Sequence, residues 1–147
     1  MAQIREIMNG ETALAAEAML LLRPRWLDAT TVVEFIDTQL RPTGYRLVGV
    51  FESGASTALS VLGFREMWST AFGHYLYVDD VSTLEAARGK GFADELIRWV
   101  VAEAHHRECA EVHLDSGVGN DRAPAHRLYI RNHFRISAHH FSLEVDS

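Results

Sequence analysis

Residues 88–93, Arg88-Gly89-Lys90-Gly91-Phe92-Ala93, join an apolar-rich run to a helical pattern and so indicate the class of fold. The run before them, 74–78, reads His-Tyr-Leu-Tyr-Val, and the pattern after them, 92–101, repeats apolar residues at helical spacing. A strand, a glycine loop and a helix N-terminus form an arrangement that binds phosphate, because backbone N–H groups turn inward and the helix dipole favours an anion. The stretch therefore predicts an α/β protein with a phosphate-binding loop.

Length and composition limit the classes of protein that this chain can belong to. Its 147 residues, 48% of them hydrophobic, suit one compact domain spanning 1–147 with a real core. A formal charge of −6 argues against nucleic acid as a partner, since such binding rests on basic surface. No apolar run reaches the length of a membrane span, which argues against a membrane partner. The N-terminal residues lack a signal-peptide pattern and there is one cysteine, so we expect a cytoplasmic protein.

The rest of the chain predicts the element order βααβββαβαβ. Strands are expected at about 4–8, 45–51, 57–68, 73–83, 110–115 and 137–145, and helices at about 11–22, 31–40, 90–107 and 124–132. Thr30 or Thr31 with Glu34 resembles a capping box for the second helix. An antiparallel meander that feeds a right-handed βαβ crossover gives a mixed sheet with helices on both faces. The last strand could extend the sheet across a homodimer.

Three groups of residues resemble the motifs of a known family. The pattern Arg88-x-x-Gly91-x-Ala93 is similar to the Gln/Arg-x-x-Gly-x-Gly/Ala signature of the GNAT superfamily of acyl-CoA N-acyltransferases. Residues 79–83, Asp-Asp-Val-Ser-Thr, resemble the end of that family's fourth strand, and Leu128-Tyr129 with Phe134 resembles its last helix. The resemblance implies a GNAT-like acyl-CoA N-acyltransferase fold in which strands four and five are parallel and splay apart.

The resemblance also implies where acetyl-CoA, the donor substrate, would bind. The pyrophosphate would lie on the backbone N–H groups of residues 88–94, and the pantetheine arm would pair with residues 81–83. The implied contacts are Val81, Ser82, Thr83, Arg88, Gly89, Lys90, Gly91, Phe92, Ala93, Asp94 and Arg122. Arg122 stands where family members often carry asparagine, and His133 replaces the usual glycine. Asn132 or His133 is therefore expected to adopt the left-handed backbone conformation.

Transfer from a thioester to an amine needs a proton acceptor for the amine, a donor to the oxyanion and an acid for the thiolate. The resemblance implies that Tyr129 is this acid. Asp79 is the preferred base and Asp80 the alternative, although a water chain would also serve. The oxyanion donor is expected to be a backbone N–H, that of Val81 or Ser82. Strand alternation is expected to place Tyr77, Asp79, Val81 and Thr83 on one face, and Val78 and Asp80 on the other.

The sequence as a whole predicts an acetyl-CoA-dependent N-acetyltransferase that acts directly on a primary amine. The acidic balance favours a small, cationic acceptor, either a small molecule or a peptide amine. The alternative is a catalytically silent acyl-CoA-binding sensor or interaction module, which keeps the loop and does not need Tyr129 or Asp79. No functional metal is expected, because the histidines at 105–106 and 139–140 match no zinc motif and Cys109 has no second cysteine beside it.

Overall fold

The computed structural model describes residues 2–146 and divides into two compact units, Met1–Leu114 and Asp115–Ser147. The first unit contains a five-stranded sheet and the helices α1, α2 and α3. The second contains α4 and the C-terminal segment. The prediction that residues 1–147 form one domain stays a prediction, and its two end residues lie outside the described range. The mixed α/β class is confirmed.

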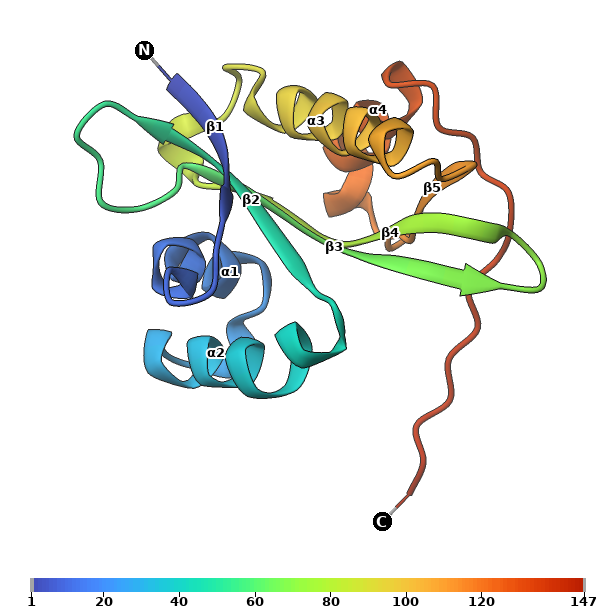
Figure 1. Cartoon of the computed structure of the whole chain (residues 1–147), viewed down its shortest axis with the longest axis horizontal. Helices are drawn as coiled ribbons and strands as arrows, with labels where there is room; N and C mark the ends of the chain where they lie inside the picture. The colour runs from blue at the N-terminus through green and yellow to red at the C-terminus, as the bar shows by residue number, and fades with distance from the viewer. Residues whose placement is uncertain (1, 147) are drawn as a thin grey trace. The chain divides into compact units, whose positions relative to one another are not determined.

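The sheet of the first unit has the strand order β1-β2-β3-β4-β5 (Figure 1). Its strands are β1 (Ala2–Ile7), β2 (Arg46–Glu52), β3 (Ser60–Ser69), β4 (Gly73–Thr83) and β5 (Glu111–Leu114). The first four are antiparallel neighbours, while β4 and β5 run parallel, as the crossover through α3 predicts. The predicted strand positions up to residue 115 are therefore confirmed within a few residues.

Helices lie on both faces of this sheet, with α1 (Ala16–Leu22) and α2 (Ala29–Phe35) on one side and α3 (Phe92–His106) on the other (Figure 1). The apolar side chains of α1 and α2 share a core with Leu47 and Val61 of the sheet. The predicted capping box of the second helix is wrong. Asp28 caps α2 by accepting a hydrogen bond from the Thr31 backbone N–H at 2.8 Å, so the helix begins one residue before Thr30.

A β-bulge in β4 changes which side chains share a face. Gly63 of β3 pairs with Asp80, while the next residue of β3, Phe64, pairs with Val78, so Asp79 is the extra residue. The register also pairs Arg65 with Tyr77, which puts Tyr77 on the same face as Asp80. The predicted alternation, with Tyr77 opposite to Asp80, is therefore wrong, because a bulge shifts the side-chain period by one residue.

Strands β4 and β5 are paired over only part of the length of β4. Their parallel ladder runs from Tyr75 opposite Glu111 to Val78 opposite Leu114, whereas β4 itself continues to Thr83. The predicted parallel pairing of the two strands is confirmed, whereas their predicted splay stays a prediction, because β5 itself ends at Leu114. Residues 79–83 therefore carry backbone groups that β5 does not use.

The second unit differs from the prediction at its end. Helix α4 (Ala123–Arg131) has proline in its first turn, as predicted. Residues 134–146, however, form neither strand nor helix, and the strand expected at 137–145 is wrong. Phe141, Leu143 and Val145 alternate as in a strand, yet each is about nine-tenths exposed. A strand requires a hydrogen-bonded neighbour, and apolar alternation alone does not supply one.

Candidate functional site

The loop between β4 and α3 has the backbone conformation that the sequence predicts. Gly89 and Gly91 adopt left-handed φ values of 79° and 81°, which favour glycine. Gly91 is the N-cap residue of α3, and since it has no side chain it cannot cap the first N–H groups of the helix. Residues 88–91 are exposed, and they include the cationic side chains of Arg88 and Lys90. The loop thus presents backbone donors, positive charge and a helix N-terminus to solvent.

Arginine side chains contact the carbonyl groups of β4 beyond its ladder with β5. Arg23 Nη2 donates to the Asp79 carbonyl at 3.0 Å, and Arg88 Nε donates to the Thr83 carbonyl at 3.2 Å. The Ser82 hydroxyl instead donates to the carbonyl of Ala18 in α1 at 2.7 Å, which ties this end of β4 to the first helix. The Thr83 hydroxyl lies 2.7 Å from that of Ser60. The end of β4 is therefore held by its ladder with β3 and by these side chains, without pairing to β5.

Asp79, the residue added by the bulge, is held by one arginine. Arg65 Nε and Nη2 donate to the two carboxylate oxygens of Asp79 at 2.9 and 2.8 Å, which is a bidentate ion pair. Burial raises the pKa of the Asp79 carboxyl above its usual range, and the Arg65 guanidinium only partly opposes this rise. A raised pKa makes the carboxylate a better proton acceptor, whereas the ion pair restricts its orientation.

Asp80 has different partners and is more deeply buried. Its Oδ2 accepts a hydrogen bond from the Tyr45 hydroxyl at 2.7 Å, and its Oδ1 accepts from Arg23 Nε at 3.0 Å. Burial, and then the Asp80 carboxylate, raise the pKa of Tyr45 well above its usual value, so this phenol stays protonated and donates. Gly63 leaves the space for this contact, since a Cβ there would lie 1.9 Å from the Tyr45 hydroxyl oxygen.

The structure thus brings Asp79 and Asp80 together with three residues that the sequence analysis missed, namely Arg23, Tyr45 and Arg65. These partners lie at a distance from the aspartates in sequence, on the segment after α1, directly before β2 and on β3. Nothing in their local pattern signals a shared site. The pairing of β2 with β3 and of β3 with β4, together with the packing of α1 against β4, brings them together.

Tyr129 lies in α4, within the second unit, and the end of that helix holds its ring. The Phe134 N–H donates to the Tyr129 carbonyl at 3.0 Å and the His133 N–H donates to the Ile130 carbonyl at 3.0 Å, which together form a Schellman motif. His133 adopts φ 72°, so the prediction of a left-handed residue at 132 or 133 is confirmed. The motif brings the Phe134 ring edge-on to the Tyr129 ring, with centroids 6.0 Å apart. Arg122 ends the turn that precedes α4 and is half-buried.

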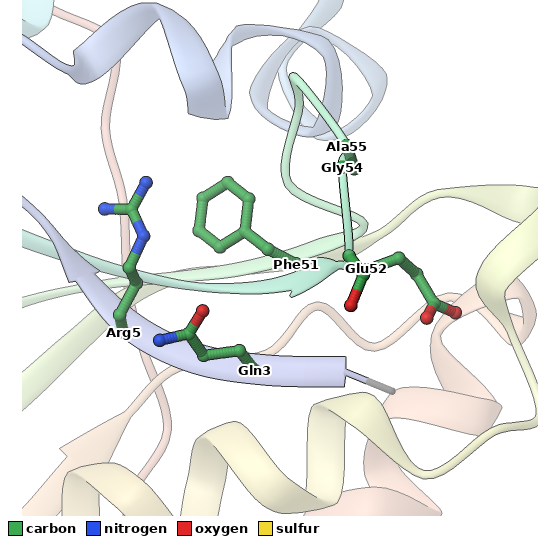
Figure 2. A pocket seen from close by; sticks show the side chains of 7 residues that line it. Gln3, Arg5, Phe51, Glu52, Gly54 and Ala55 are labelled. Carbon is green, nitrogen blue, oxygen red and sulfur yellow. The ribbon is translucent and has the colours of Figure 1, made fainter.

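A shallow hollow of about 200 Å³ lies elsewhere, at the β1 edge of the sheet (Figure 2). Figure 2 shows Gln3 and Arg5 projecting from β1 beside Phe51 of β2, and the Arg5 guanidinium lies 4.5 Å from the Phe51 ring centroid. In the strand order β1 is separated from β4 by two strands, so the hollow does not include the loop or the two aspartates.

Among residues 2–146, none of the helices has the length and apolar character needed to span a bilayer.

No curated protein matches the sequence of this chain significantly. Solved structures do match it in fold. A ribosomal-protein-alanine N-acetyltransferase from Brucella melitensis biovar Abortus 2308 has a TM-score of 0.77 at 18% identity, covering 99% of this chain and 100% of its own. An aminoglycoside acetyltransferase from an uncultured soil metagenomic sample has a TM-score of 0.79 at 18% identity, covering 99% of each chain.

A transcriptional regulator from Bacillus halodurans C-125 has the same fold, with a TM-score of 0.77 at 21% identity, and covers 99% of this chain and 100% of its own. At sequence identities of 18–21%, the similarity to these three structures shows the fold alone. The sequence model of the acetyltransferase (GNAT) family, in contrast, matches residues 11–134, which include the glycine loop, both aspartates and Tyr129. The chain therefore belongs to the acetyltransferase (GNAT) family and is an acyltransferase.

Proposed function

We propose that this acyltransferase moves the acetyl group of acetyl-CoA directly to a primary amine of a small, cationic acceptor. The observation that carries the proposal is the exposed double-glycine loop at the N-terminus of α3, next to an end of β4 that β5 leaves unpaired. The loop offers backbone donors and two cations to a pyrophosphate. Residues 81–83 offer an extended backbone edge to the amides of a pantetheine arm. Arg122 is a further proposed contact of the cofactor.

In the proposed step, the amine nitrogen attacks the thioester carbonyl carbon, the new C–N bond forms and the C–S bond breaks. Tyr129 donates its phenolic proton to the leaving thiolate. The proton of the amine passes to Asp79, whose pKa is raised by burial, or to water beside it. Asp80 is engaged by Tyr45 and Arg23, so we assign it a positioning role rather than that of the base.

Direct transfer needs no acyl-enzyme, and the surroundings of the single cysteine agree with this. Burial, and then the Glu66 carboxylate, raise the pKa of the Cys109 thiol, so at neutral pH it is protonated and a poor nucleophile. Cys109 follows the end of α3 opposite to the glycine loop. The net charge of −6 supports a cationic acceptor.

The proposal is tested by following thiol release from acetyl-CoA with a panel of amines. The panel contains a polyamine, an aminoglycoside, amino-acid derivatives and an alanine peptide of a ribosomal protein. Steady release with at least one cationic amine is the expected result. Tight binding of acetyl-CoA without turnover on any amine would contradict the proposal and favour a silent acyl-CoA sensor.

A matched pair of variants tests the acid. Tyr129→Phe keeps the ring against Phe134 and removes the proton, so we expect kcat to fall about 100-fold or more. Tyr75→Phe, which removes a hydroxyl from the part of β4 that pairs with β5, should leave kcat unchanged. If the two variants have equal rates, Tyr129 is not the acid. Asp79→Asn should lower the rate and remove the acidic limb of the pH profile of kcat/KM.

A further inference from the structure

Three potential metal ligands from separate elements meet at the end of the β3–β4 hairpin. Glu66 lies on β3, His74 on β4, and Cys109 follows α3. One donor atom from each of them lies within 4.8 Å of the other two, and all three residues are partly buried. His74 Nε2 is central, at 2.5 Å from Glu66 Oε2 and 3.5 Å from Cys109 Sγ. The site lies wholly within the first unit.

The backbone holds each of these residues in place. Glu66 and His74 lie diagonally across the antiparallel ladder, where Trp68 pairs directly with His74. Cys109 is held by a Schellman motif at the end of α3, in which its N–H donates to the Ala104 carbonyl at 2.8 Å. The next residue, Ala110, donates its N–H to the His74 carbonyl at 2.9 Å. The cysteine and the histidine are thus joined through the main chain.

The spacing of the donors suits a tetrahedral ion. Zinc bound at about 2.3 Å from sulfur and about 2.0–2.1 Å from nitrogen separates those two donors by about 3.5 Å, which is the distance in the structure. The carboxylate oxygen and the imidazole nitrogen would have to separate by about 1 Å from their present hydrogen bond. A carboxylate, an imidazole and a thiolate form a mixed O, N and S set, which favours zinc over calcium or magnesium.

The surrounding residues orient two of the ligands. Arg107 Nη2 lies 3.2 Å from Glu66 Oε1, which leaves Oε2 directed at His74. The Trp68 ring stacks on the His74 ring, with centroids 4.6 Å apart and planes 3° from parallel. Such outer contacts fix the orientation of metal ligands in known sites. Burial and Glu66 disfavour a bare thiolate at Cys109, and a divalent cation would reverse that preference.

We infer that Glu66, His74 and Cys109 form a binding site for a zinc-like divalent cation, with a fourth position open to water. The ion would join the β3–β4 hairpin to the end of α3. This site is separate from the proposed acetyl-transfer chemistry, and the family resemblance does not include it. No metal was expected from the sequence, because its paired histidines match no zinc motif and there is no second cysteine. Glu66, His74 and Cys109 themselves are 8 and 35 positions apart and follow no local motif.

The test uses the full chain without a histidine tag and the metal ions alone as probes. Titration with Co²⁺ should produce a near-ultraviolet band from charge transfer between thiolate and metal, saturating at one ion per chain. Zn²⁺ should displace the Co²⁺ and raise the Tm of the protein. Absence of the charge-transfer band in the wild-type protein would overturn the inference, whatever the variants show.

Variants separate the three-residue site from a simple surface thiol. His74→Ala and Cys109→Ser should each weaken Zn²⁺ binding about 100-fold, since each removes one of the few bonds that share the binding free energy. His106→Ala, at an exposed histidine of α3, is the control and should bind Zn²⁺ like the wild type. Far-ultraviolet circular dichroism checks that each variant is folded. If His74→Ala leaves the affinity unchanged, the proposed site is wrong.

Discussion

Replacing Gly63 by alanine should strongly destabilise the first unit, because the position of its Cβ is already occupied. That Cβ would lie 1.9 Å from the Tyr45 hydroxyl oxygen and 2.5 Å from the ring carbon that carries it. Ordinary contact begins at 3.4 Å, so the hydroxyl would have to move by about 1.5 Å in a site where Tyr45 is only 3% exposed. A displacement of this size breaks the 2.7 Å hydrogen bond to Asp80.

The expected cost follows from two effects. Overpacking of a well-packed core costs about 1–3 kcal/mol. Loss of a hydrogen bond to a charged group adds about 1.5–3 kcal/mol, since the Asp80 side chain is only 10% exposed and water replaces the hydroxyl poorly. We therefore expect Gly63→Ala to lower the free energy of unfolding by about 2.5–6 kcal/mol, a large share of the stability of a typical domain.

Urea unfolding followed by tryptophan fluorescence measures this cost. Gly49→Ala is the matched control on β2, because its Cβ would approach nothing closer than 3.0 Å, at the flexible end of Ile7. It should cost about 1 kcal/mol. Tyr45→Phe alone should cost about 1.5–3 kcal/mol, and in combination with Gly63→Ala the total should fall short of the sum, since the hydrogen bond is lost only once. Equal effects of the two alanine variants, or strict additivity with Tyr45→Phe, would refute the reasoning.

Three further predictions concern other parts of the chain. Arg46→Met should cost about 2–3 kcal/mol in urea unfolding near pH 7. The hydrogen bonds from Arg46 lower the pKa of Glu6 below 4.5 and so stabilise the folded wild type at neutral pH. The wild type should lose this stabilisation as pH falls through the folded pKa of Glu6, whereas the variant, which never has it, should not show that loss. His133→Gly should gain about 1 kcal/mol in thermal or urea unfolding, because glycine relieves a left-handed residue; a loss would contradict the assigned φ. Gly91→Ala and Gly10→Ala, at φ 81° and 87°, should each cost about 1–2 kcal/mol, but calorimetry should show weaker acetyl-CoA binding only for Gly91→Ala.

The loop, the hairpin and the element order as far as α4 were predictable because their signals are local. Left-handed glycines, a proline in a first helical turn and period-two alternation act within a few residues along the chain. The Schellman motif at residues 129–134 belongs to the same class, since its hydrogen bonds join residues at most five apart. The N-cap of α2 is also a local signal, but the prediction placed it at Thr30 or Thr31, whereas Asp28 caps the helix.

Two errors have a different origin. The bulge at Asp79 has no glycine to mark it, and the stretch Val78-Asp79-Asp80-Val81 reads as a regular strand. The segment 137–145 has the alternation of a strand but no hydrogen-bonded neighbour in the described chain. In both cases the outcome depends on pairing with another strand, which the pattern of a single strand does not contain.

Local sequence alone thus determined the class of fold, the phosphate-type loop and the resemblance that led to the family, because backbone preferences and hydrophobic period act over short distances. Only the tertiary structure decided the surroundings of the two aspartates. Arg65 holds Asp79, and Tyr45 and Arg23 hold Asp80, since strand register and helix packing bring together residues up to 57 positions apart. The same is true of Glu66, His74 and Cys109. Such side-chain groupings arise from long-range packing, and no local pattern encodes them.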